Sequence, residues 1–210
     1  MSYEIPAYSM KVRGTPASGK TVLSKLLAKH ISQQDPDVHV IWINGWPPME
    51  QGGNYYRYLK QQGWVECEKT VFILDSAQSS YDDLGLWNDF FKSIHEYNGR
   101  CRAIAFATYG SPTSRMYVWG ILIVIPDHQR VTLRHIDHKD DLPPVGLLFT
   151  RREFDDLVAN DHPSSEYHFH SSFFDAIFNI TNGHVGAFYV FIGIITAHDV
   201  SCFVSKRMMV

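Results

Sequence analysis

A glycine-rich segment near the start of the chain carries the residue types best suited to chemistry. Residues 12–22 read Val-Arg-Gly-Thr-Pro-Ala-Ser-Gly-Lys-Thr-Val, and Gly14, Gly19, Lys20 and Thr21 follow the spacing G-x-x-x-x-G-K-[ST]. Glycine tolerates backbone conformations that other residues avoid, so such a loop can curl and direct successive N–H groups at one anion. The spacing therefore predicts a phosphate-binding P-loop of the Walker A type.

The predicted ligand is a nucleoside triphosphate with Mg²⁺. In such a loop, Lys20 reaches the β and γ phosphates and Thr21 offers its hydroxyl to the ion that bridges them. A helix that begins at Lys20 adds its unpaired N–H groups and positive dipole end to the same site. The sequence shows no base-recognition segment of the GTPase kind, which favours ATP. The residues expected to contact ATP are Gly14, Thr15, Pro16, Ala17, Ser18, Gly19, Lys20, Thr21 and Val22.

An aspartate at the end of an apolar run is the second candidate for this site. Residues 70–75 read Thr-Val-Phe-Ile-Leu-Asp, a continuous apolar run typical of a strand covered on both faces. Mg²⁺ bound with a nucleotide takes one or two carboxylates besides the phosphates. We therefore predict that Asp75 and Thr21 hold Mg²⁺; the alternative is that Asp75 caps the turn that follows the strand.

The residues that would activate water are marked less clearly. Many ATPases carry a glutamate directly after this aspartate, but here Ser76 follows Asp75. Gln78 is the candidate for orienting the attacking water, as a glutamine does in some GTPases. Thr108, at the end of another predicted strand, is the candidate for a hydrogen bond to the γ phosphate. Both also suit ordinary loop and strand-end positions, so slow hydrolysis and binding without hydrolysis both stay open.

Other polar and aromatic residues give weaker signals. Three arginines are candidates for a transition-state cation: Arg115, Arg151 and Arg152. Asp155 and Asp156 stand where they would simply pair with the last two. A histidine-rich stretch with His162, His168 and His170 lacks a fixed carboxylate or cysteine partner and does not predict a zinc site. The aromatic run at residues 55–58 suits core packing better than base stacking.

The order of the predicted elements indicates an α/β fold. Strands are expected at residues 8–12, 38–43, 70–75, 101–108, 117–125 and 130–136, and helices at 20–31, 54–62, 82–97, 150–159, 171–180 and 184–198. Strands that alternate with helices imply right-handed crossovers and a mainly parallel sheet flanked by helices, with ligands at the carboxyl ends of the strands. The last two strands are candidates for a hairpin through residues 126–129.

Helices dominate beyond Pro143 and Pro144, which suggests a division of the chain. We expect a P-loop nucleotide-binding core at residues 1–142, a small helical C-terminal lid at 143–200 and a tail at 201–210 that resembles the end of a truncated product.

Composition is that of an ordinary globular protein: 210 residues, of which 45% are hydrophobic and 20% charged. A net charge of −3 does not indicate nucleic-acid binding. Three cysteines without a C-x-x-C spacing fit a reducing compartment. The start of the chain lacks signal-peptide features, and the most apolar stretches, 116–126 and 185–197, are shorter than the roughly 20 residues that span a bilayer. We expect an intracellular protein, cytoplasmic or nuclear, with no membrane contact.

Three segments together resemble the STAND-like or AAA-like ATPase domain of Crinkler-type proteins from fungi. They are residues 12–21, residues 72–78 (Phe-Ile-Leu-Asp-Ser-Ala-Gln) and residues 181–187 (Thr-Asn-Gly-His-Val-Gly-Ala), and the likeness covers roughly residues 11–198. The resemblance implies that the first segment binds ATP, that the second supplies the magnesium aspartate, and that the third begins a lid helix near the nucleotide.

The same resemblance bears on activity and biological context. Ser76 stands where the family has a second acidic residue, and this departure concerns hydrolysis more than nucleotide binding. The resemblance also implies a modular secreted effector with a ubiquitin-like header and a nuclease-like module, neither of which is recognised in this sequence.

The expected function is that of a slow ATPase or nucleotide-controlled switch of a Crinkler-like protein. A small-molecule kinase, such as a nucleoside or nucleotide kinase, is the alternative, with Arg151 and Arg152 as its candidate lid arginines. A third reading is a nucleotide-binding interaction module without catalysis, for which Ser76 is the supporting feature. Besides ATP, the expected partners are another protein or a second copy of the chain.

Overall fold

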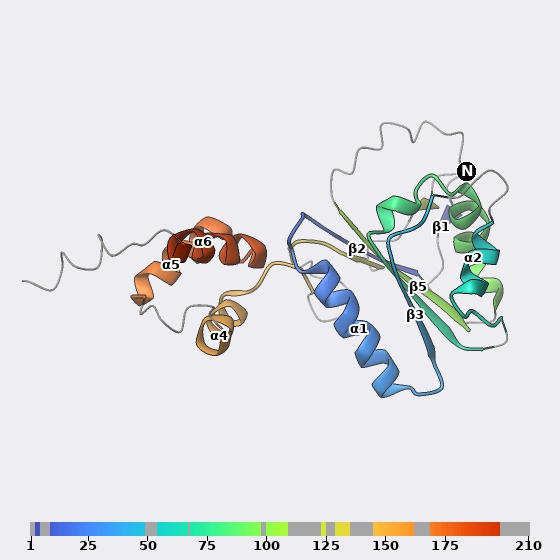
Figure 1. Ribbon diagram of the computed structural model, residues 1–210, viewed down its shortest axis with the longest axis horizontal. Helices are drawn as coiled ribbons and strands as arrows, with labels where there is room; N and C mark the ends of the chain where they lie inside the picture. Colours follow the sequence, from blue (N-terminus) through green and yellow to red (C-terminus); the bar gives the residue numbers. More distant parts are fainter. Residues whose placement is uncertain are drawn as a thin grey trace, which may run out of the picture.

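The chain folds as an α/β protein around a five-stranded sheet in which every pairing is parallel. A computed structural model describes residues 3–4, 9–48, 54–66, 68–97, 100–108, 123–124, 129–134, 145–161 and 169–197. The strand order is β3-β4-β5-β2-β7 (Figure 1). The strands are β2 (Ser9–Gly14), β3 (His39–Asn44), β4 (Thr70–Asp75), β5 (Cys101–Thr108) and β7 (Arg130–Val131). The predicted α/β class and parallel sheet are confirmed.

Helices cover both faces of this sheet. On one face, α1 (Lys20–Gln34) packs Leu27 and Ile31 against a core that includes Ile73 and Phe106. On the other face, α2 (Tyr55–Gln61) and the segment after β4 enclose a larger core that holds Trp64 and other aromatic side chains (Figure 1). Parallel strands buried on both faces read as unbroken apolar runs, and all six residues of β4 are buried.

The segment between β4 and β5 is helical but not one regular helix. A 3₁₀ turn η1 (Ala77–Ser80) precedes a π-helical turn η2 (Leu86–Phe90), a short α3 (Phe91–Ser93) and a 3₁₀ turn η3 (Ile94–Tyr97). The predicted continuous helix at 82–97 is therefore correct in place but not in type. The adjacent side chains of Phe90 and Phe91 are both buried, and packing of such bulky groups overrides local periodicity.

The predicted hairpin around residues 126–129 is wrong. The short strand β6 (Ile123–Val124) pairs in parallel with β1 (Tyr3–Glu4), and β7 pairs in parallel with β2. Residues 117–122 of the predicted strand lie outside the described residues. Pairing partners are decided by long-range packing, which the local turn signal at 126–129 does not report.

Three helices follow the sheet and form their own core. They are α4 (Arg151–Asp161), α5 (Ser171–Thr181) and α6 (Val185–Ala197), gathered to one side of the sheet (Figure 1). Phe154, Ile177 and Phe188 are buried between them. Helix α6 is buried on one side only: Phe188 and Ile192 lie in this core, whereas Val190 is 59% exposed and Ile194 52% exposed.

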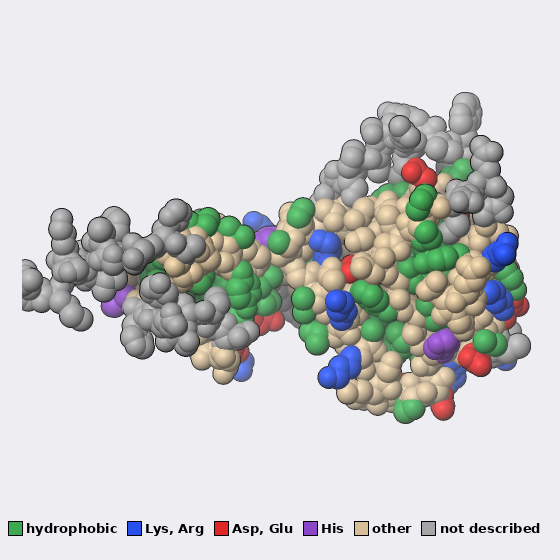
Figure 2. Space-filling view, in the orientation of Figure 1, with side chains coloured by type: hydrophobic (Ala, Val, Ile, Leu, Met, Phe, Trp, Pro, Cys, Tyr) green, Lys and Arg blue, Asp and Glu red, His purple; other side chains and the backbone are tan. Residues whose placement is uncertain are grey.

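Figure 2 shows hydrophobic side chains on the surface of the helical part. None of the described helices combines the length and the apolar character needed to cross a membrane.

Candidate functional site

The glycine-rich loop has the local setting that its spacing predicts. It leaves β2 at Gly14, lies at the carboxyl end of that strand, and enters α1 at Lys20. Gly19 has φ 83°, a left-handed conformation that favours glycine. A Cβ on Gly14 would lie 2.5 Å from the Ser18 hydroxyl and from a Leu147 methyl group, so a side chain there would require both groups to shift. The backbone conformation of the loop thus favours glycine at position 19, and its close packing favours glycine at position 14.

Lys20 folds back over the loop. Its Nζ donates to the carbonyl oxygen of Thr15 at 2.6 Å and that of Gly14 at 3.1 Å, and lies 3.4 Å from the Ser18 hydroxyl. Burial lowers the pKa of Lys20, and the nearby carboxylate of Asp75 partly offsets this. Because the acceptors are neutral, an anion at this position would form stronger, charge-assisted hydrogen bonds with Nζ.

Asp75 ends β4 as a buried carboxylate with one unused oxygen. The side chain is only 3% exposed, and its Oδ1 accepts a hydrogen bond from the backbone N–H of Ser76 at 3.0 Å. Its Oδ2 has no hydrogen-bond partner among the described residues. A buried, unpartnered carboxylate oxygen is costly. It is also a suitable ligand for a hard cation such as Mg²⁺, so this aspartate fits the ion that a nucleotide would bring.

One cavity of about 790 Å³ brings the main predicted residues together. The loop contributes its residues 16–22, β4 and the following turn contribute Asp75 and Ser76, and β5 contributes Thr108. Of the predicted ATP-contacting residues, Pro16, Ala17, Ser18, Gly19, Lys20, Thr21 and Val22 line it. Gly14 and Thr15 lie at the base of the loop, where their carbonyl groups hold Lys20.

Gln78 bonds to the end of β5 next to the cavity. Its Oε1 accepts a hydrogen bond from the backbone N–H of Thr108 at 3.2 Å, and it is not among the described residues that line the cavity. The side chain ties the turn after β4 to the end of β5. The structure therefore gives Gln78 a role in placing Thr108.

The arginine and histidine candidates that the structure describes, Arg151, Arg152 and His170, do not line the cavity. Arg151 pairs with Asp155 at 2.9 Å and with Asp175 at 2.5 Å, so it joins α4 to α5. Neither Arg151 nor Arg152 lines the cavity, and Arg115 lies outside the described residues.

His170 caps α5 by accepting from the N–H of Ser172. His162 and His168 lie outside the described part, in which no group of three or more metal-ligating side chains occurs.

The aromatic run at 55–58 behaves mainly as core. Tyr55 and Tyr58 pack against the buried cluster that contains Trp64, in agreement with the packing interpretation. Tyr56 is 37% exposed and bonds to Glu66.

Residues of the helical part also line the cavity, and only two of them belong to the segment 181–187. Phe149, Leu157, Val185, Gly186 and Tyr189 face it from that side. The segment 181–187 indicated a lid helix, but no local signal identified which of its side chains meet the loop.

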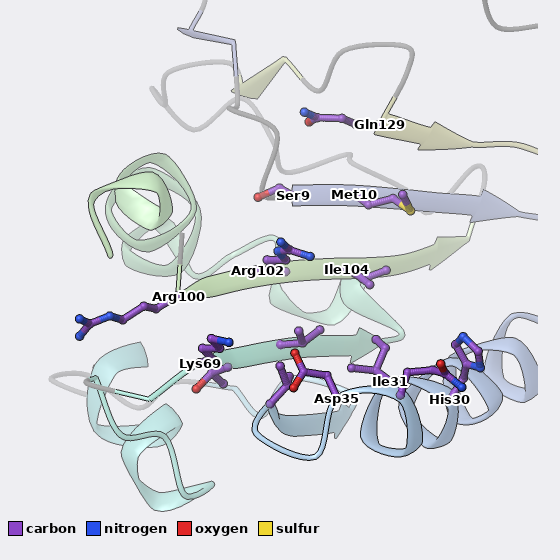
Figure 3. Close-up of a pocket in the computed structure, with 15 residues that line it drawn as sticks. Ser9, Met10, His30, Ile31, Asp35, Lys69, Arg100, Arg102, Ile104 and Gln129 are labelled. Atoms are coloured by element: carbon purple, nitrogen blue, oxygen red, sulfur yellow. The ribbon is translucent and has the colours of Figure 1, made fainter. Parts of the chain in front are cut away.

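A second cavity, of about 530 Å³, lies at the amino ends of the strands (Figure 3). Lys69, Arg100 and Arg102 lie around an apolar floor that includes Ile31 and Ile104. All three cationic residues are exposed, and no glycine among the described residues lines this cavity. Within the described part of the chain, a glycine-rich loop that leads into a helix lines the first cavity and not the second.

Comparison with known proteins adds no evidence on the function of this site. The sequence matches no protein-family model and no curated protein.

Proposed function

We propose that this protein binds ATP with Mg²⁺ in the 790 Å³ cavity and acts as a slow ATPase or nucleotide-controlled switch. The observation that carries the proposal is the convergence of a glycine-shaped loop, the start of α1, Lys20 and buried Asp75 on one cavity. The resemblance to Crinkler-type ATPase domains belongs to the same proposal, as does a P-loop NTPase fold.

The phosphate part of the argument rests on backbone as well as side chain. Helix α1 is 15 residues long, so its dipole and the unpaired N–H groups of its first turn favour an anion at the loop. Lys20 already lies over that loop, where phosphate oxygens would replace the carbonyl acceptors of Gly14 and Thr15. ATP is the proposed nucleotide because the sequence shows no base-recognition segment of the GTPase kind.

The metal part of the argument rests on strand order. Because β5 lies between β2 and β4, the ends of β2 and β4 are separated by two strand spacings, about 10 Å. That gap has room for phosphate oxygens and a hydrated ion between Thr21 on one side and Asp75 on the other. Thr108 ends the intervening strand and lines the same cavity, which supports the proposal that it contacts the terminal phosphate.

Slow ATP hydrolysis is expected because no second carboxylate lies beside Asp75 among the described residues that line the cavity. Asp75 is the only carboxylate among the described residues that line the cavity, and Ser76 follows it. The amide oxygen of Gln78 is engaged by Thr108. The same observations favour a second candidate function, a nucleotide-binding module that does not hydrolyse its ligand.

Control by nucleotide follows from the second wall of the cavity. The loop and β4 form one wall, while Leu157, Val185 and Tyr189 of the helical part form another. A ligand that contacts both walls binds more tightly when they are together, and so favours that arrangement.

Calorimetric titration with ATP, with and without Mg²⁺, tests nucleotide binding, and phosphate release on the same samples tests hydrolysis. We expect Lys20→Ala to weaken binding strongly and to abolish any release. Lys29→Ala is the matched control, because Lys29 lies on the same helix but is exposed and does not line the cavity. Equal affinity of wild type and Lys20→Ala would refute the site.

A further inference from the structure

A hydrogen bond joins the loop to the helical part of the chain. The Nε2 atom of His184 lies 2.8 Å from the Thr15 hydroxyl, although the two residues are 169 positions apart. Thr15 belongs to the loop between β2 and α1, and His184 directly precedes α6. The contact therefore connects the candidate phosphate site with the first turn of the helix that faces it.

The other ring nitrogen of His184 fixes the direction of this hydrogen bond. The backbone N–H of Ala187 donates to Nδ1 at 3.1 Å, so Nδ1 carries a lone pair. In a neutral imidazole the proton then resides on Nε2, an assignment made from the hydrogen-bond network. His184 consequently donates to Thr15 while it caps the start of α6.

Two glycines allow the close approach. Gly183 has φ 77°, and a Cβ there would lie 2.2 Å from the carbonyl oxygen of Phe149. A Cβ on Gly186 would lie 2.3 Å from the carbonyl oxygen of Ala17, within the loop. No side chain fits at either position, so α6 begins directly against the loop backbone. The segment 181–187 is shaped for this contact.

We propose that His184 is a positioning residue through which the helical part and the phosphate-binding loop control each other; this inference rests on the proposed function. Thr15 contacts both the phosphate-binding lysine and the helical part. Its carbonyl oxygen accepts from Lys20 at 2.6 Å, and its hydroxyl accepts from His184 at 2.8 Å. When Lys20 Nζ moves from the Thr15 carbonyl oxygen to a phosphate oxygen, Thr15 loses one hydrogen bond. The Thr15 hydroxyl, which His184 contacts, then experiences that change. Coupling of this kind is reciprocal in binding free energy.

The docked helix is expected to keep the loop in its binding shape. Loss of the Thr15–His184 hydrogen bond should weaken ATP affinity about 3- to 10-fold, the size of one net hydrogen bond. By reciprocity, ATP should slow amide hydrogen exchange at residues 185–189, the first turn of α6.

Three substitutions separate this role from a merely structural one. Thr15→Val removes the hydroxyl at nearly constant shape, and Thr15→Ser retains it. His184→Asn keeps a good helix cap but is too short to reach Thr15. We would measure the Kd for ATP with Mg²⁺, and hydrogen exchange at residues 185–189, in the full chain.

We expect Thr15→Val and His184→Asn each to raise the Kd, the double variant to be no worse than either, and Thr15→Ser to match wild type. Additive losses, or wild-type affinity of His184→Asn, would overturn the inference. If wild type binds no ATP, the proposed function fails, but amide hydrogen exchange without nucleotide still tests the coupling between the loop and α6. Faster exchange at residues 185–189 in Thr15→Val and His184→Asn, but not in Thr15→Ser, would support this coupling. Unchanged exchange would refute it.

Discussion

The two cavities at opposite ends of the same parallel sheet differ in how positive charge is presented. At the carboxyl ends, the loop at residues 15–19, the start of α1 and partly buried Lys20 face a buried aspartate. At the amino ends, exposed Lys69, Arg100 and Arg102 surround an apolar floor (Figure 3). The difference explains why we propose the phosphate site at the carboxyl ends. Backbone N–H groups there are already oriented and lose little entropy on binding, whereas exposed side-chain cations must be ordered first.

The largest difference in ATP affinity is expected between two variants that each lose one cation, one at the carboxyl ends of the strands and one at the amino ends. Lys20→Ala should weaken ATP binding on the order of 10- to 100-fold, because a charge-assisted hydrogen bond to phosphate is lost. Arg102→Ala, at the amino ends of the strands, should leave the Kd unchanged. Calorimetry on both variants makes the comparison. A larger effect from Arg102→Ala would reverse the assignment of the two cavities.

Lys11, a partly buried lysine on β2, tests the effect of a side-chain cation that lies among aromatic rings and other cations. Lys11 lies over the rings of Tyr81 and Trp87, and burial, together with Arg13 and Arg130, lowers its pKa from 10.5 to about 8. Its charge therefore destabilises the fold below pH 8, and this penalty shrinks as pH rises from 8 to 10.5. Lys11→Met should raise the free energy of unfolding at pH 7 by roughly 1–3 kcal/mol.

Urea unfolding of Lys11→Met and wild type at pH 7 and pH 10 measures this difference. The gain should be smaller at pH 10, where Lys11 is largely neutral in the folded wild type. A constant gain at both pH values would mean that packing, and not charge, limits this position.

Alanine substitutions at two glycines of α6 distinguish the contact with the loop from the general effect of glycine on helix stability. Among the described residues, no atom outside the adjacent helix backbone lies within 4 Å of a Cβ added to Gly193, so Gly193→Ala should stabilise the protein by up to about 1 kcal/mol. Gly186→Ala places the same methyl group 2.3 Å from the Ala17 carbonyl oxygen and should cost about 1–3 kcal/mol. Thermal unfolding of both variants checks the sign. Stabilisation by Gly186→Ala would show that α6 does not press on the loop.

A similarly small change in stability is expected at Asp75. Asp75→Asn removes a buried charge whose Oδ2 has no described partner, so the fold should gain about 1 kcal/mol. The enhancement of ATP binding by Mg²⁺ should disappear in the same variant, because an amide is a poorer ligand for this ion. Titrations with and without Mg²⁺ test this. Retained magnesium dependence would move the metal site away from β4.

The sequence alone determined the elements that local patterns encode. The apolar runs fixed β4 and β5 at residues 70–75 and 101–108, and the glycine spacing placed the loop between β2 and α1. These features are predictable because alternation, apolar runs and glycine requirements are properties of short segments. The same patterns identified Lys20, Thr21 and Asp75, which the fold brings to one cavity.

Only the tertiary structure decided which distant residues meet. It inserted β5 between β2 and β4, paired β6 with β1, turned Gln78 onto Thr108, and set His184 against Thr15. Each of these contacts joins residues far apart in the chain. Their formation depends on the packing of the whole core and not on the propensity of either segment, so no local pattern reports them.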